Sequence, residues 1–189
     1  MSVTTRSSGA SAAALALALL CGAAAVQSAA PPLPAAVHGE APGLRVQGGG
    51  EMTFFGLSIY EGYYWSGERG FSMERPFALD LVYKRKLDGR RIAERSSDEI
   101  ATLGFGSADD RRRWGDAMAR IFPDVAKGDR LTGLYVPRGG VRFFHNGAPI
   151  GEIADPAFAG AFFGIWFDPR TSRADFRRQL LGLAPCGAR

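Results

Sequence analysis

Two residues in the second half of the chain, Asn146-Gly147, constrain the fold more than any other feature of the sequence. Asn-Gly between two strand-like segments is the strongest short-range signal for a two-residue β-hairpin, because both turn residues accept a positive φ. The strands that this turn joins are predicted at 141–145 and 150–153. A hairpin link makes its strands antiparallel, so the sequence predicts an antiparallel sheet rather than β-α-β units.

Earlier segments add strands to this sheet. Every second residue of 77–83 is apolar, which is typical of a strand with one buried face. Aromatic and β-branched residues dominate 51–65, and another strand is predicted at 130–136. The three glycines at 48–50 are predicted to interrupt the strand pattern as a turn or a close backbone approach. They are not interpreted as a phosphate loop, because no Lys-Ser/Thr follows them.

Helices are predicted between and after these strands. The first covers 90–103, and the second begins at Ser107, where Asp110 completes a capping signal. Asp155-Pro156 opens a third helix, with Asp at the N-cap and Pro at the first position. Ser172 is expected to cap the last helix. The order of strands, helices, strands and helices predicts an α+β fold, an antiparallel β-sheet covered on one face by helices.

The N-terminal residues 1–28 have the pattern of a secretory signal peptide. Arg6 provides a positive charge, an apolar run follows at 12–25, and Val26-Gln27-Ser28 fits a cleavage site. The run is shorter than the roughly 20 apolar residues that span a bilayer. We therefore expect an exported, periplasmic protein of a bacterial envelope, without a stable membrane span after cleavage. A retained anchor is the alternative.

Residues 29–43 are rich in Pro, Ala and Gly and are predicted to form a flexible, extended lead-in to a single domain at 44–185. The 23 Lys and Arg residues are interleaved with 19 Asp and Glu, so the net charge of +4 does not indicate nucleic-acid binding. Cleavage would leave only Cys186, and neither His38 nor His145 has metal-ligand spacing. We expect no metal and no cofactor, and no protein partner is indicated.

Three stretches are distinctive together: GGGEMTFFGLSIY at 48–60, FPDVAKGDRLTGLY at 122–135 and GEIADPAFAGAFFGIWFDP at 151–169. They resemble the exported bacterial branch of the chalcone-isomerase-like family, over nearly the whole of the predicted domain. The resemblance implies an open-faced sandwich in which a large antiparallel sheet is backed by helices, with a mostly apolar cleft between them. Some members of the wider family close a flavanone ring from a chalcone, and others bind fatty acids without catalysis.

The catalytic members use an arginine just after the glycine-rich turn and a tyrosine near the start of the first helical region. An arginine there stabilises developing oxyanion charge. In this chain Glu51 and Met52 follow the glycines, and 89–94 contains no tyrosine. The comparison implies that the isomerase residues are missing, so no catalytic residue is predicted.

Five residues are predicted to line a ligand cleft. Arg142 lies between apolar neighbours and could pair with a carboxylate in bidentate fashion. Tyr135 and Thr132 would join it from the neighbouring strand, and Tyr60 and Tyr64 would supply aromatic walls. The alternatives are that Arg142 faces solvent on an alternating strand and that the tyrosines only fill the core.

The sequence thus favours non-catalytic binding of a hydrophobic or fatty-acid-like carboxylate between sheet and helices. An intramolecular lyase or isomerase with a rearranged site is the first rival, and it requires a cationic or strong donor group lining the cleft, for example Arg142 or Arg45. A structural or accessory envelope protein is the second, and it would have a solid core without a pocket.

Overall fold

A single sheet of six strands organises the molecule. The computed structural model describes Met1 and residues 30–183, so the predicted signal peptide lies, apart from Met1, outside the described residues. Strands that are consecutive in sequence are neighbours in the sheet, and every pair is antiparallel. The strands are β1 (Arg45–Phe54), β2 (Leu57–Ser66), β3 (Phe77–Tyr83), β4 (Arg130–Val136), β5 (Gly140–His145) and β6 (Ala148–Ile153). Positive φ angles of 50° at Asn146 and 84° at Gly147 confirm the predicted hairpin.

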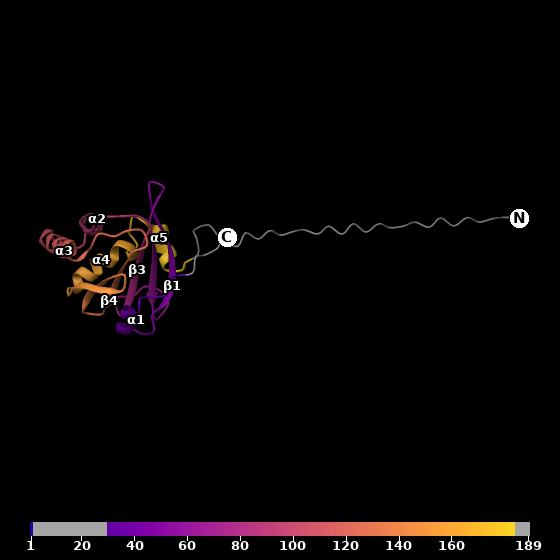
Figure 1. The fold of residues 1–189 in the computed structure, drawn as a ribbon, viewed down its shortest axis with the longest axis horizontal. Coiled ribbons are helices and arrows are strands. Elements are labelled where there is room, and N and C mark those ends of the chain that lie inside the picture. Colours follow the sequence, from indigo (N-terminus) through magenta and orange to yellow (C-terminus); the bar gives the residue numbers. More distant parts are fainter. Residues whose placement is uncertain (2–29, 184–189) are drawn as a thin grey trace.

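Four helices cover one face of this sheet. Helices α2 (Gly89–Thr102) and α3 (Ala108–Ile121) connect β3 to β4, while α4 (Pro156–Phe167) and α5 (Ala174–Leu180) follow β6. Their apolar residues share one core with the inward residues of the strands, and a short helix α1 (Ala35–Glu40) lies apart from them (Figure 1). The predicted α+β class, with an antiparallel sheet covered on one face by helices, is confirmed.

Helix α4 is the centre of this core. It is apolar around its whole circumference, because it lies between the sheet and α2. The side chain of Asp155 accepts hydrogen bonds from the backbone N–H groups of Ala157 at 2.8 Å and Phe158 at 3.2 Å, and Pro156 takes the first position, as predicted. The indole of Trp114 also donates to Asp155, at 2.9 Å, and so ties α3 to the start of α4.

The glycines at 48–50 allow α5 to lie directly against β1. A Cβ at Gly48 would be 2.2 Å from the carbonyl oxygen of Gln179 and 2.6 Å from the nitrogen of Gly182. The predicted close backbone approach is therefore confirmed, whereas the predicted interruption of the strand is wrong. β1 runs through the three glycines, with an irregularity in register between Val46 and Gly48.

The lead-in departs from the sequence-based expectation of an extended segment. Residues 35–40 form α1, and Val37 is completely buried against the face of the sheet opposite the large helices. That face carries Tyr63, Trp65, Leu134 and Phe144, so it needs an apolar cover of its own. The extended interpretation was wrong because this packing, rather than local sequence, stabilises the helix.

The helix caps were predicted with mixed success. Ser107 and Asp110 form the expected capping box at the start of α3. Ser172 does not cap the last helix, whose N-cap is Arg173. Its hydroxyl instead donates to the carboxylate of Glu99, at 3.4 Å. The segment before α5 therefore contacts α2.

Candidate ligand-binding cavity

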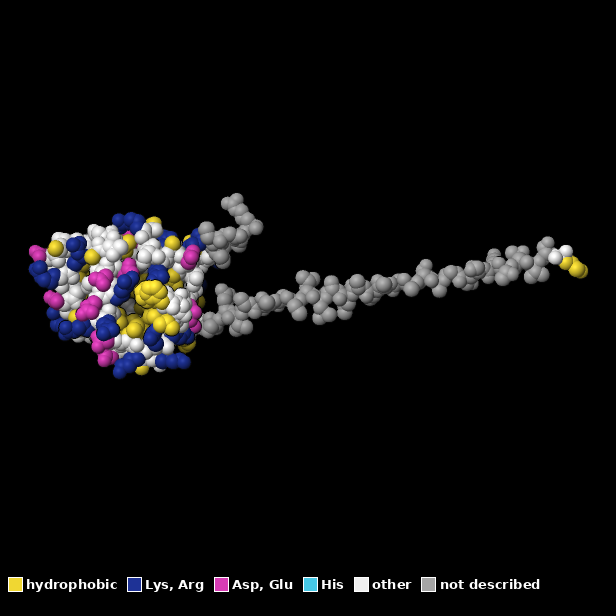
Figure 2. All heavy atoms as spheres, turned by 90° about the horizontal axis from the view of Figure 1, so that it is seen from above, with side chains coloured by type: hydrophobic (Ala, Val, Ile, Leu, Met, Phe, Trp, Pro, Cys, Tyr) yellow, Lys and Arg dark blue, Asp and Glu magenta, His cyan; other side chains and the backbone are white. Residues whose placement is uncertain are grey.

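A cavity of about 320 Å³ lies between the sheet and helices α2 and α4. Specific small-molecule sites occupy about 300–1,000 Å³, so the space is large enough for a small ligand. The apolar part of its wall consists of Met52, Phe54, Ile59, Leu81, Leu87, Ile92, Phe122, Leu131, Phe162, Ile165 and Trp166. The cavity opens on the face drawn in Figure 2, where hydrophobic side chains surround a hollow and Lys and Arg side chains border them.

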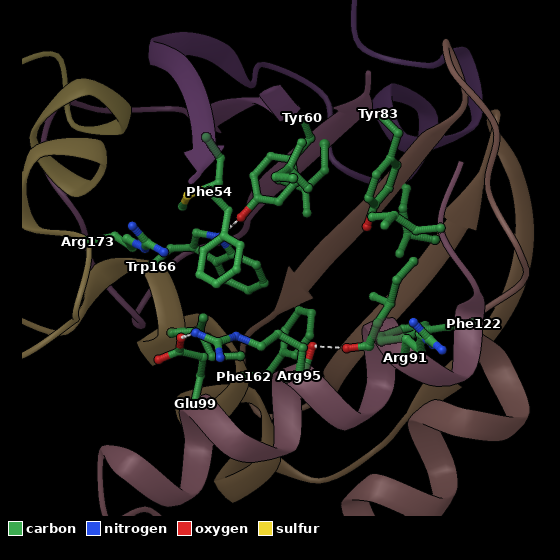
Figure 3. A pocket seen from close by; sticks show the side chains of 18 of the residues that line it. Phe54, Tyr60, Tyr83, Arg91, Arg95, Glu99, Phe122, Phe162, Trp166 and Arg173 are labelled. Atoms are coloured by element: carbon green, nitrogen blue, oxygen red, sulfur yellow. Dashed lines mark hydrogen bonds and ion pairs between the residues drawn. The ribbon is translucent and has the colours of Figure 1, made fainter. Parts of the chain in front are cut away.

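Two tyrosines place the polar atoms inside this apolar wall. Tyr60 and Tyr83 are cross-strand neighbours on β2 and β3, with ring centroids 5.8 Å apart. The hydroxyl of Tyr60 accepts a hydrogen bond from the indole N–H of Trp166 at 3.0 Å. The hydroxyl of Tyr83 points into the cavity and has no hydrogen-bond partner among the described residues (Figure 3).

Burial keeps both phenols neutral. It raises the pKa of Tyr60 to about 12, although the hydrogen bond from Trp166 and the charge of Arg173 act in the opposite direction. Burial also raises the pKa of Tyr83, and the neighbouring Tyr60 adds to the effect. At neutral pH the cavity therefore presents hydroxyl donors rather than phenolate charges.

Charged residues gather at the opening rather than in the interior (Figure 3). Arg95 and Glu99, one turn apart on α2, form an ion pair. The guanidinium of Arg173 lies 5.6 Å from the ring centroid of Phe54. Neither Arg91 nor Arg173 has a carboxylate partner within the part of the chain that the structure describes. Arg91 and Arg173 lie on opposite sides of the pocket (Figure 3), so the opening offers a cation on each side to an anionic group.

Of the five residues predicted from sequence, Tyr60 lines the cavity. Tyr64 and Tyr135 face the helices but lie farther along the sheet, toward the opposite ends of their strands. The hydroxyl of Tyr64 donates to the carbonyl of Gly70 at 3.0 Å, and that of Tyr135 donates to the carbonyl of Met73 at 2.7 Å. Both tyrosines are buried parts of the core, so the cavity does not use them.

Arg142 and Thr132 lie on the opposite face of the sheet. Arg142 donates to the carboxylate of Glu40 on α1 at 2.6 Å and lies 3.4 Å from that of Glu152. Thr132 is fully buried and donates to Asp80 at 2.8 Å. The predicted grouping of Arg142, Thr132 and Tyr135 is therefore not found, because alternation along each strand sends these side chains to different faces.

Sequence reasoning missed most of the cavity's polar residues. The alternation over 77–83 places Tyr83 on the buried face, at the last position of the strand. A polar side chain at that position was the signal that could have identified it. Arg91 and Arg95 are spaced i, i+4 on a predicted helix, which places them on one side of it. Arg173 gave no comparable signal, because its place beside Phe54 depends on how α5 packs on β1.

The described residues contain no group of three or more His, Cys, Asp or Glu side chains placed to hold a metal ion. Within the same residues, no helix is both long enough and apolar enough to cross a membrane.

The protein is thus an α+β sandwich, an antiparallel sheet backed by helices, with an apolar cavity large enough for a small ligand. Comparison with known proteins identifies its family. The model of the chalcone isomerase-like family matches residues 72–182. The chain therefore belongs to the chalcone isomerase-like family. The match includes β3, β4 and all four helices of the covered face, and it stops short of β1 and β2.

Two individual proteins are similar to the chain. An uncharacterized protein from Haemophilus influenzae is 32% identical over 109 residues, which is 58% of this chain and 53% of that protein. The chain thus spans about half the length of the curated relative it matches. The crystal structure of a fatty-acid binding protein from Arabidopsis thaliana superposes with a TM-score of 0.60, covering 74% of this chain and 87% of that one. Their sequence identity is 10%, so this likeness concerns the fold.

Proposed function

We propose that this protein binds a single-tailed carboxylate, such as a fatty acid, without chemical conversion. The tail occupies the apolar cavity, and the carboxylate lies at the opening beside one of the two cations, Arg91 or Arg173. The observation that carries the proposal is the combination of an apolar cavity of about 320 Å³ with two cations at its opening that have no carboxylate partner among the described residues. The likeness in fold to a fatty-acid binding protein agrees with it.

The apolar cavity and the cations at its opening would contribute to recognition in different ways. Burying the tail provides affinity, at roughly 25 cal/mol for each Å² of apolar surface removed from water. A hydrogen bond between a guanidinium and a carboxylate adds about 1.5–3 kcal/mol and fixes the direction in which the ligand enters. The hydroxyl of Tyr83 is left as a donor for an oxygen atom carried within the tail.

Two observations favour binding over the isomerase or lyase alternative. The two cations lie at the opening, so an oxyanion formed inside the cavity would face the neutral hydroxyls of Tyr60 and Tyr83 rather than a positive charge. The raised pKa of Tyr60 and of Tyr83 makes each hydroxyl a weaker acid than free tyrosine, so neither is tuned to transfer a proton near neutral pH. The presence of the cavity also argues against a purely structural role, because a structural protein needs only a solid core.

Native mass spectrometry of the full chain with dodecanoate tests the proposal. We expect one bound molecule that dissociates on unfolding. The variant Ile59→Trp should abolish binding by filling the cavity from its partly buried wall, while Val46→Trp adds the same bulk at an exposed position of β1 and should leave binding intact. Equal binding by the two variants, or none by the wild type, would count against the proposal.

We further propose that the protein is the exported, periplasmic form of this family. The support is the sequence of residues 1–28, with Arg6 followed by the apolar run and small residues. The intact mass of the protein isolated from a periplasmic fraction tests this, and a new N-terminus near residue 29 is expected. A chain that retains Met1 and stays in the cytoplasm would contradict export.

A further inference from the structure

The hairpin between β1 and β2 carries large apolar side chains into solvent. Phe54 ends β1, Leu57 begins β2, and Phe55-Gly56 connects them. The exposed fractions are 45% for Phe54, 89% for Phe55 and 54% for Leu57. We call these three residues the tip patch. The hairpin projects beyond the neighbouring elements (Figure 1), so within the described structure its turn has no core to pack against.

Phe55 is unfavourable for the turn that it occupies. Its φ is 47° and that of Gly56 is 75°, the pattern of a turn that prefers Asn-Gly. A bulky aromatic residue in this left-handed region is strained, and here it gains no burial in return. The rings of Phe54 and Phe55 meet edge to face at the tip, with centroids 4.5 Å apart, and Phe55 remains 89% exposed. Neither local conformation nor packing within the described residues therefore accounts for Phe55, which points to a partner outside the chain.

Basic residues border the tip patch. The backbone N–H of Lys84 donates to the carbonyl of Ile59 at 2.9 Å, which places the exposed Arg85 and Lys86 next to the start of β2. Arg173 lies over the ring of Phe54. Lys84 is paired with Glu61 at 2.9 Å. Within the described part of the chain, Arg85, Lys86 and Arg173 have no carboxylate partner, and neither does Arg91, which lies across the pocket from Phe54 (Figure 3). We call these four residues the basic rim.

An apolar tip bordered by cations that have no carboxylate partner among the described residues is suited to the surface of an anionic bilayer. Aromatic and aliphatic side chains enter the boundary between headgroups and acyl chains, while Lys and Arg contact lipid phosphates and add about 1 kcal/mol each. Figure 2 shows the same arrangement on one face of the molecule, with hydrophobic side chains in the middle, Lys and Arg around them and the hollow beside them. Phe54 belongs both to the tip patch and to the cavity wall.

We propose that the tip patch and the basic rim dock this protein on an anionic lipid membrane, with the cavity opening against the lipid. A single-tailed amphiphile could then pass between bilayer and cavity without exposing its tail to water. The docking surface goes beyond the proposed binding function, because it needs no ligand in the cavity. Vesicle binding without dodecanoate binding would keep the docking proposal and remove the function, and the reverse result would do the opposite.

Vesicle flotation of the full chain tests the docking. We expect binding to phosphatidylglycerol vesicles that is at least tenfold stronger than to phosphatidylcholine vesicles and that weakens with salt. Phe55→Asn should reduce binding at least tenfold while making the fold more stable, since Asn suits the turn. A damaged fold would lower both, so the opposite signs identify a binding role. Val46→Thr, at the other end of β1, is the matched control and should bind as the wild type does.

A paired change tests the basic rim. Arg85→Ser with Lys86→Ser should remove much of the preference for phosphatidylglycerol and flatten the salt dependence. Arg112→Ser with Arg120→Ser removes the same charge from α3 and should have little effect, because long-range attraction is screened. Any contribution of the apolar run at 12–25 is common to all variants. Equal losses in the two pairs would overturn the role of the rim.

A fluorescent reporter locates the contact. The three native tryptophans, Trp65, Trp114 and Trp166, are buried, so Phe55→Trp adds an exposed indole whose emission can be separated by subtracting the wild type. We expect a blue shift on phosphatidylglycerol vesicles and quenching by brominated lipids. Unchanged emission from the added indole would overturn the proposal even if the chain floats with the vesicles. Shielding only by a co-purified protein would overturn it in favour of a protein partner.

Discussion

The two faces of the sheet carry polar residues in different ways. On the face under α1, Asp80 is fully buried and accepts hydrogen bonds from Thr132 at 2.8 Å and from the guanidinium of Arg130, while Arg142 pairs with Glu40 and Glu152. On the face under the large helices, the hydroxyl of Tyr83 points into a cavity without a partner among the described residues.

The comparison separates polar residues that stabilise the fold from those available to a ligand. A buried polar group without a partner costs free energy, so it persists where something outside the chain can satisfy it. Among the described residues, Arg142 and Thr132 have protein partners, whereas the buried hydroxyl of Tyr83 does not, and neither do the exposed Arg91 and the half-buried Arg173. The buried indole N–H of Trp65 on the α1 face also lacks a partner among the described residues, so it is the cavity that makes ligand recognition expected on the other face.

The largest expected effect comes from removing a partner on the α1 face of the sheet. Arg130→Ala leaves the buried carboxylate of Asp80 without its ion pair and should lower the free energy of unfolding by about 3–5 kcal/mol. Arg91→Ala, at the cavity opening, should change it by less than about 0.5 kcal/mol. Denaturant unfolding measures both, and similar losses in the two variants would remove the distinction between the faces.

The fold was predictable where its signals are local. Asn146-Gly147, Asp155-Pro156 and the Ser107 capping box each act within three or four residues, and all three are found as predicted. Helix α1 was not, because it depends on the burial of Val37 against strands far away in sequence. The N-cap at Ser172 was wrong for a related reason, since the contact with Glu99 on α2 takes its hydroxyl.

The cavity was less predictable than the fold. The alternation of Val141 and Phe143 toward the helices already places Arg142 on the other face, so its position could have been inferred. Arg173 could not, because its neighbour Phe54 is more than a hundred residues earlier and meets it only through the packing of α5 on β1. The residues that form a cavity opening come from separate elements, and no short sequence pattern records their meeting.

The second prediction concerns affinity for the ligand. Arg91→Ala with Arg173→Ala should weaken dodecanoate binding about tenfold or more, corresponding to about 1.4 kcal/mol, because the carboxylate loses the cation beside it. Binding of dodecanol, which has the same tail without the charge, should change little. Arg142→Ala is the control on the other face and should leave both affinities unchanged. Calorimetric titration measures them, and a loss in Arg142→Ala would restore that residue as part of the site.

The third prediction compares two tyrosines by the sign of the change in stability. Tyr83→Phe removes a hydroxyl that has no partner among the described residues, and it should raise the free energy of unfolding by up to about 1 kcal/mol. Tyr135→Phe removes the hydrogen bond to the carbonyl of Met73 and should lower it by about 1 kcal/mol. Thermal unfolding without ligand distinguishes them. A loss of stability in Tyr83→Phe would mean that its hydroxyl is already satisfied.

The smallest expected effect is in alkaline solution. Burial raises the pKa of Tyr60 to about 12 on the cavity face, and burial together with the hydrogen bond to Glu61 raises that of Tyr63 to about 12 on the opposite face. The unfolded chain loses these protons near pH 10, so the stability that both groups contribute is complete below about pH 10 and is lost as pH rises toward 12. A ligand in the cavity should displace water beside Tyr60 and not beside Tyr63. The difference between the tyrosinate titrations of wild type and Tyr60→Phe should therefore show a further rise of the pKa of Tyr60 with dodecanoate, whereas the difference between wild type and Tyr63→Phe should show no change for Tyr63. If dodecanoate shifts the two difference titrations equally, its effect does not come from the cavity.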